Sequence, residues 1–414
     1  MVTRLKGSGP ATLRVPGFGR LALSYAINEL GDLFGLVALA ILVLDHTGDP
    51  FAVAGLFLAS KFVPALLSPF LTARIDRIAT RRVLPALYVA ETAAFAGLAL
   101  IVVTGFSLAA VLALAFVDGF IALTARSLSR AAVAAVMVPR GRLREGNAVL
   151  NVAFAVTSAV GPAAAGVLVS MAGAAAALWV DAGSFALIAL LLATSTRLPP
   201  ARVEHASPWH KRVREGFDQV RRQPVQTLVA LQALALVFFF LVIPIEVVYA
   251  KHTLHAGNEG FGALLAAWGV GILIGSYGFA RFKDRPIAEL VGVSTFLIGL
   301  GYLGMAAAPG IGLACAAAVV GGVGNGVQWI SVVTAVQEAI DESMQARVIG
   351  LLESLAAAAP GVGYLVGGTL TSLWSPRAAY LLAGLGVVVI AWAMVRRLAG
   401  PQPAALPPAG PAAQ

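Results

Sequence analysis

Charged residues are scarce in this sequence, and cysteine is almost absent. Only 12% of the 414 residues are charged, whereas 59% are hydrophobic, and Cys315 is the single cysteine. A disulfide framework and a thiol-rich metal site are therefore excluded. His252 and His255 have helical spacing but only Glu259 as a nearby acid, so we expect no metal centre.

The sequence also lacks the motifs of ATP-driven pumps and of hydrolases. It contains no Gly-x-x-x-x-Gly-Lys phosphate loop, which argues against an ATP-driven pump within this chain. The segment GGVGNG at 321–326 lies inside an apolar run with no strand before it, so it does not predict a nucleotide site. No Ser/His/Asp set presents itself for hydrolysis. We therefore expect neither an enzyme nor a bound cofactor.

Long apolar runs are what the sequence has in abundance. Twelve of them are nearly free of charge and reach about 20 residues, the length that a helix needs to cross a bilayer. They lie near 21–44, 51–73, 83–104, 107–127, 147–171, 175–195, 225–249, 260–280, 287–307, 311–336, 347–372 and 378–395. These runs predict an all-α membrane protein with twelve transmembrane helices.

One long polar interval, RVEHASPWHKRVREGFDQVRRQP at 202–224, divides the helices six and six. ARIDR at 73–77, after the second helix, is echoed by RFKDR at 281–285, after the eighth, which indicates an internal repeat. We expect two pseudo-symmetric six-helix bundles around a central cavity. The expected organisation is an N-terminal segment 1–20, a first bundle 21–195, a linker 196–224, a second bundle 225–397 and a disordered tail 398–414.

The positive charge is distributed unevenly between the two sides of this arrangement. Nearly all Lys and Arg fall in segments that an even number of crossings places on one side; only Lys251 and Arg377 fall on the other, and Lys61 lies within a predicted helix. By the positive-inside rule, both termini are cytoplasmic and the protein spans the cytoplasmic membrane. The net charge of +9 therefore reflects topology, and we expect no nucleic-acid partner.

The stretch ARIDRIATRR at 73–82 concentrates charge between the second and third apolar runs. It resembles the loop motif of the major facilitator superfamily, in which Gly-x-x-x-Asp-Arg precedes further basic residues. Asp76, Arg77 and Arg81 match that motif. The resemblance implies a transporter fold in which Asp76 latches the two halves in one orientation, with Arg126 or Arg130 as its partner.

Asp284 and Arg285 form the equivalent pair after the eighth helix and are the matching gating candidates. The alternative reading of these loops is that their arginines only fix the orientation of the chain in the membrane.

The segment 140–169 resembles the drug and siderophore exporter branch of the same superfamily. Asn147, Ala148, Gly161, Pro162 and Gly166 match the branch motif. The resemblance implies export in exchange for protons. Gly161, Pro162 and Gly166 either bend the fifth helix as a hinge or let a neighbouring helix pack closely, and the sequence favours neither reading.

A polar stripe runs along the first predicted helix. Tyr25, Asn28, Glu29 and Asp32 recur at spacings of three and four, so they share a face that must point into the bundle. Asp32 lies roughly 16 Å from the inner end of its helix, and Lys61 roughly 18 Å from its own. An ion pair of Lys61 with Asp32 or Glu29 is therefore expected.

Other acids lie inside the apolar runs, where an ionisable group is costly and is a functional candidate by default. Glu91, Asp118 and Glu353 lie deep, whereas Asp181 and Glu246 fall near outer helix ends, where a wet rim suffices. Our order of candidates for proton coupling is Asp32, Glu29, then Asp118 and Glu353. Each acid could equally be a satisfied structural contact.

The candidates for substrate binding are Tyr25, Asn28, Lys61 and Phe240. Phe240 belongs to the run Phe238–Phe240 of the seventh helix, in which we expect at least two rings to face lipid.

These features predict a secondary transporter that exports amphipathic small molecules, such as drugs, siderophores or secondary metabolites, in exchange for protons. Its expected partners are the substrate, protons and the lipid bilayer, and we expect a monomer. Two alternatives remain open. One is a facilitator or exporter of anionic metabolites without proton coupling, with Lys61 and Arg126 recognising the anion. The other is a transport-dead membrane sensor or scaffold, for which buried charges would have no use.

Overall fold

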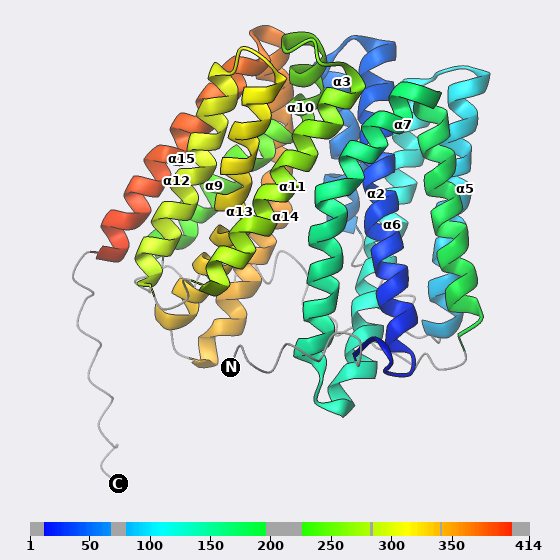
Figure 1. Ribbon diagram of the computed structural model, residues 1–414, viewed down its shortest axis with the longest axis horizontal. Coiled ribbons are helices and arrows are strands. Elements are labelled where there is room, and N and C mark those ends of the chain that lie inside the picture. The colour runs from blue at the N-terminus through cyan, green and yellow to red at the C-terminus, as the bar shows by residue number, and fades with distance from the viewer. Residues whose placement is uncertain (1–11, 68–79, 196–225, 282–284, 340–341, 400–414) are drawn as a thin grey trace.

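A computed structural model describes residues 12–67, 80–195, 226–281, 285–339 and 342–399, and every regular element in these ranges is helical. The first half of the chain forms the right-hand bundle of Figure 1 and the second half forms the left-hand bundle. Buried apolar side chains fill each bundle, and the core of the first bundle extends to residues of the second such as Val247 and Phe261. The predicted all-α membrane fold of two helical bundles is confirmed.

The helices of the first bundle are α2 (Phe18–Thr47), α3 (Pro50–Phe57) with the π-helical turn η2 (Leu58–Phe62), α5 (Thr80–Thr104), α6 (Leu108–Met137) with the short η3 (Val138–Arg140), and α7 (Leu143–Ala193). The second bundle contains α9 (Gln226–Val242), η4 (Ile243–Ile245), α10 (Glu246–Val248), η5 (Tyr249–Thr253), α11 (Gly257–Arg281), α12 (Ile287–Ala307), α13 (Ile311–Ala339), α14 (Glu342–Leu373) and α15 (Pro376–Ala399).

The 51 residues of α7 form two crossings. A straight helix of that length would extend roughly 77 Å, far beyond the ~30 Å hydrocarbon core. Gly173, with φ 82° and ψ 167°, breaks it into two antiparallel rods, between the predicted spans 147–171 and 175–195. Ten helices of the described chain are long and apolar enough to cross a membrane. With α7 counted as a pair and the 32-residue α14 added, this is consistent with twelve crossings.

The bundles meet at one end. We call the end at which α2 begins and α15 ends the inner end, and the opposite one the outer end (Figure 1). At the outer end, Lys251 of η5 forms an ion pair with Asp45 of α2. Ser170 of α7 donates a hydrogen bond of 2.7 Å to Glu259 of α11. These bonds join the two bundles across the outer end.

Glycines bring the backbones of the two bundles together along the same seam. A Cβ at Gly262 of α11 would overlap the carbonyl oxygen of Pro162 and lie 3.1 Å from Cα of Gly166, both on α7. Within the second bundle, a Cβ at Gly271 would lie 2.7 Å from Cα of Gly322. The glycine-rich segments of α11 and α13 therefore serve close helix packing, as in other membrane bundles.

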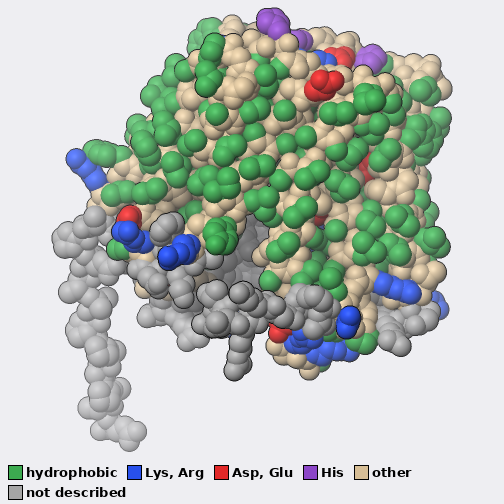
Figure 2. All heavy atoms as spheres, in the orientation of Figure 1, with side chains coloured by type: hydrophobic (Ala, Val, Ile, Leu, Met, Phe, Trp, Pro, Cys, Tyr) green, Lys and Arg blue, Asp and Glu red, His purple; other side chains and the backbone are tan. Residues whose placement is uncertain are grey.

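The bonds described near the inner end are of a different kind. The ion pairs of Arg142 with Glu145 and of Arg285 with Glu289, and the hydrogen bond of Arg20 with Thr194, each stay within one bundle. Figure 2 shows the surface hollowed between the bundles on that side. The described residues thus join the bundles across the outer end and leave a hollow between them on the inner side, as in one of the two arrangements of alternating access.

The substitution Gly262→Val is expected to shift the protein away from the arrangement that is closed at the outer end. The new side chain would overlap Pro162, and overpacking of this kind costs about 1–3 kcal/mol, which changes a population by about 5- to 150-fold. The measurement is the distance distribution between spin labels at Met171→Cys and Leu313→Cys, two exposed positions, in a Cys315→Ser background. It should gain a longer component.

Gly278→Val on the same helix is the matched control, because nothing lies within 4 Å of a Cβ built there. Identical distance distributions in the two variants would mean that the glycine seam does not hold the outer end closed.

Candidate functional site

A polar face of α2 points into the first bundle near the middle of the membrane. Tyr25, Asn28 and Asp32 are partly exposed, and Glu29 is buried. Asp32 lies roughly 21 Å along a helix of roughly 45 Å. Asn28 donates a hydrogen bond of 3.1 Å to Oδ2 of Asp32. The structure therefore places the predicted stripe as the sequence indicated, with its carboxylates at mid-depth.

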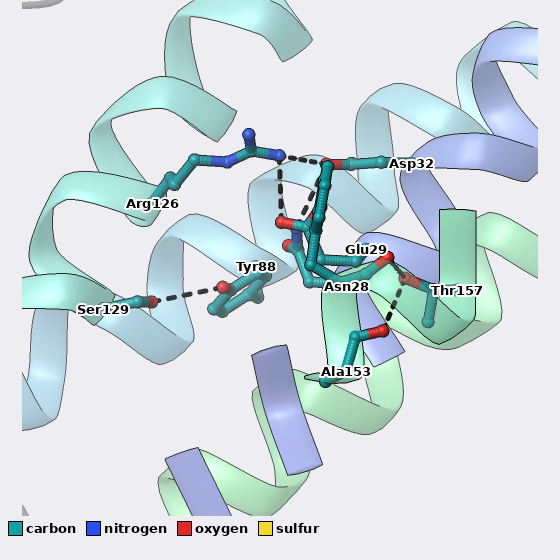
Figure 3. Close-up of polar contacts among 9 residues, drawn as sticks. Asn28, Glu29, Asp32, Tyr88, Arg126, Ser129, Ala153 and Thr157 are labelled. Carbon is teal, nitrogen blue, oxygen red and sulfur yellow. Dashed lines mark hydrogen bonds and ion pairs between the residues drawn. The ribbon is translucent and has the colours of Figure 1, made fainter. Parts of the chain in front are cut away.

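Arg126 of α6 binds both carboxylates of this face (Figure 3). Its Nη2 lies 2.8 Å from Oδ2 of Asp32 and 3.3 Å from Oε1 of Glu29. The Arg126 side chain is 37% exposed and that of Asp32 is 20% exposed, whereas that of Glu29 is only 8% exposed. We call Glu29, Asp32 and Arg126 the triad. It has two acids and one base, and part of it is open to solvent.

The expected ion pair between Lys61 and Asp32 or Glu29 is wrong. Within the described part of the chain both acids pair with Arg126, and Lys61 makes no ion pair. The physical reason is the length of α6, which continues to Met137 instead of ending near residue 127. Arg126 is therefore a side chain within a crossing helix and not part of the loop that follows it.

Lys61 lies across a small pocket from the triad. The charged residues that line this pocket are Asp32, Lys61 and Asp118, and Gly35, Phe57 and Phe95 are among its other walls. A Cβ at Gly119 would overlap the carbonyl oxygen of Ser60, so α6 and the π-helical turn η2 touch backbone to backbone. This contact brings Asp118 and Lys61, the residues next to that pair, to the same pocket.

Two further acids are completely buried. Glu91 of α5 and Asp181 of α7 are each 0% exposed. Both carboxylate oxygens of Glu91 and Oδ2 of Asp181 have no hydrogen-bond partner within the described chain. The expectation that Asp181 lies at a wet outer rim is wrong, because its side chain packs against α2 at Gly31 and Gly35. The spacing of Gly31 and Gly35 on α2 was the signal that could have indicated this.

Aromatic rings connect the two bundles above the pocket. Phe57, which also lines the pocket, lies 5.5 Å from Tyr364 of α14, and Tyr364 lies 5.9 Å from Phe240 of α9, measured between ring centroids. Phe238, Phe239 and Phe240 are all partly buried. The expectation that two of these rings face lipid is therefore wrong, because each packs against another helix of its own bundle.

The motif residues have mixed outcomes. Gly161 packs against Leu33 of α2, with a Cβ only 2.8 Å away, and Pro162 and Gly166 lie in the seam with α11, so all three make close packing contacts. Whether they also act as a hinge stays a prediction.

Most residues of the two predicted gating pairs lie outside the described part of the chain. Arg285 lies 3.7 Å from Glu289 in an exposed pair. Asp76, Arg77 and Asp284 lie outside the described residues, as do the side chains of Arg81 and Glu353.

The whole chain resembles transporters of known class. It is 29% identical over 393 residues to the multidrug efflux pump Tap of Mycobacterium tuberculosis, which covers 88% of this chain and 90% of that protein. It is 27% identical over 385 residues to the multidrug efflux pump Tap of Mycolicibacterium fortuitum, over 87% and 90% of the two chains. These relatives are transporters, and none is an enzyme.

Solved structures and a family model give the same result. The fold matches the nucleoside transporter NupG with a TM-score of 0.70 at 13% identity, over 92% of this chain and 99% of that one. The model of the transmembrane secretion effector family matches residues 7–407. The chain is thus a multi-pass membrane transporter that belongs to the transmembrane secretion effector family, a branch of the major facilitator superfamily.

Proposed function

We propose that this transporter exports amphipathic small molecules, such as drugs, siderophores or secondary metabolites, across the cytoplasmic membrane in exchange for protons. The observation that carries the proposal is the composition of the triad. When all three members are ionised, Glu29 and Asp32 contribute two negative charges and Arg126 one positive charge. One bound proton makes the group neutral.

This charge balance gives a physical basis for coupling. A net charge at mid-membrane is costly to enclose, so a triad without its proton favours the arrangement in which it stays wet. A neutral triad can be enclosed, and a ligand that binds one of two states better shifts their populations. Proton binding and closure of the site are thereby linked. In this proposal the inner end of the protein, with both termini, faces the cytoplasm.

The walls near the triad suit an amphipathic substrate. Tyr25 and Asn28 offer polar groups beside the triad. The rings of Phe57, Tyr364 and Phe240 offer an apolar surface that spans both bundles. Sites with apolar walls and a few placed polar groups are typical for small organic molecules. The relatives described as multidrug efflux pumps support the direction and the breadth of substrates.

The substitution Asp32→Asn is expected to uncouple export from protons. The triad would then hold one acid and one base and would no longer need a proton to be neutral. The measurement uses everted vesicles and a panel of fluorescent amphipathic dyes. The proton movement that each dye induces should be lost, while dye exchange in the absence of a proton gradient persists.

The exposed Glu289→Gln is the control, since its ion pair of 3.7 Å lies far from the triad. A proton-dependent dye gradient that survives in Asp32→Asn vesicles would remove Asp32 from the mechanism. Wild-type vesicles that move no protons with any dye would remove proton antiport altogether, and wild-type vesicles that move no dye either would favour a sensor or scaffold.

The alternative function, export of anionic metabolites without proton coupling, depends on Lys61 and Arg126 as anion ligands. Lys61 makes no ion pair within the described chain and lines the pocket, which favours this reading. Arg126 is already bound by two carboxylates, which counts against it.

The substitution Lys61→Gln separates the two functions. If protons drive export, Lys61→Gln should slow but not abolish the export of a cationic dye, because the triad still binds and releases its proton. If the protein exports anions, the same change should abolish transport of an anionic dye. The measurement is the initial rate of dye export in proteoliposomes. Loss of cationic dye export in Lys61→Gln would contradict the assignment of coupling to the triad alone.

A further inference from the structure

The carboxyl group of Asp181 lies in a notch on α2 that two glycines create. A Cβ at Gly31 would overlap Oδ1 of Asp181 and the hydroxyl of Ser184, and a Cβ at Gly35 would lie 2.5 Å from Oδ2 of Asp181. Gly31 and Gly35 are four residues apart and so share one face of α2. The notch encloses the carboxyl group, whose residue is 0% exposed.

No cation compensates this group. Within the described chain, Asp181 makes no ion pair, and its Oδ2 has no hydrogen-bond partner. The charged and titratable groups around it are Asp32 on α2, Lys61 on η2, Glu91 on α5 and Asp118 on α6. Three of these four are themselves acids. An ionised, unpaired carboxylate in such surroundings is strongly disfavoured.

The hydroxyl of Ser184 fits a carboxyl group that carries a proton. Ser184 Oγ lies 2.8 Å from the main-chain oxygen of Asp181 and 3.2 Å from its Oδ1. A serine hydroxyl has one hydrogen to donate and lone pairs with which to accept. This one hydrogen is shared between the main-chain oxygen and Oδ1, so the longer bond to Oδ1 is weak and does little to stabilise a negative charge on the carboxyl group.

A short route leads from this notch to the triad. Gly35 touches Asp181 on one side and lines the pocket on the other, beside Asp32 and Phe95. Gly35 itself adds no side chain at this point, and the ring of Phe95 lies beside the same position. Asp32 is in turn 20% exposed and bonded to Arg126, so it connects the notch to the hollow.

We propose that Asp181 holds the coupled proton while the outer end is closed, and that it exchanges this proton with Asp32 past Gly35. The O–H bond of Asp181 breaks and one forms on the Asp32 carboxylate, directly or through one water molecule. The negative charge then lies on Asp181, and Lys61 is the one cation among the four groups named around it. This inference rests on the proposed proton antiport, within which it separates the acid that stores the proton from the acid that meets the solvent.

The test is infrared difference spectroscopy of the full chain in liposomes, with a pH jump alone as the stimulus, combined with vesicle transport. Asp181→Asn should remove a carbonyl band of a protonated carboxyl group that Asp32→Asn retains. Ser184→Ala should keep this band but shift its frequency, because the hydroxyl that contacts Oδ1 of Asp181 at 3.2 Å is gone. Gly183→Ala, where a Cβ meets nothing within 4 Å, should leave the band unchanged.

In vesicles, Asp181→Asn should lose drug-dependent proton movement and keep dye exchange without a gradient, using the dye that the wild-type protein exports fastest. A band that persists in Asp181→Asn, or does not move in Ser184→Ala, would overturn the inference. Full proton coupling in Asp181→Asn would also overturn it, while loss of coupling in Asp32→Asn would leave the proposed function standing. Wild-type vesicles that move no protons with any dye would remove both, whatever the band shows.

Discussion

The bond of Arg126 with Glu29 and Asp32 is the interaction on which the arrangement of the first bundle depends. An arginine inside a membrane needs a partner, and so does a carboxylate. Here one guanidinium serves two acids, at 2.8 and 3.3 Å, and thereby fixes the face of α2 against α6. Because the acids outnumber the base, the group is not neutral by itself. The same contact that orders the helices therefore leaves a charge that a proton can cancel.

The two bundles divide the chemistry between them. The buried and half-buried charges of the first bundle lie on α2, η2, α5, α6 and α7, whereas the second bundle offers a continuous set of stacked rings, including Trp268, Tyr302 and Tyr380. Only Glu246 places an acid among those described rings, and it makes no ion pair within the described chain. In the proposed export, the proton therefore binds in the first bundle and the apolar substrate body rests on rings that include Tyr364 and Phe240 of the second, so that neither has to displace the other from its contacts.

Sequence reasoning reached the depth of the side chains but not their partners. The length and low charge of the apolar runs predicted the membrane crossings. The spacing of Tyr25, Asn28, Glu29 and Asp32 predicted that these four side chains share one face. Both predictions depend only on the geometry of a single helix. The pairing of Asp32 with Arg126 instead of Lys61 depends on how α6 stands beside α2. The burial of Asp181 depends on how α7 packs against Gly31 and Gly35 of α2, a contact between helices that no hydropathy pattern reports.

Helix α2 connects these features because it uses two faces at once. Its polar face holds the triad toward the hollow, and its glycine face holds Asp181 through Gly31 and Gly35. Its far end carries Asp45, which ties the first bundle to Lys251 at the outer seam. If α2 moves against α7 when the seam with the second bundle opens, the same motion changes the enclosure of Asp181 and the exposure of Asp32. Coupling between proton and orientation then needs no long relay, because the gate, the buried acid and the solvent-facing acid belong to one helix or touch it.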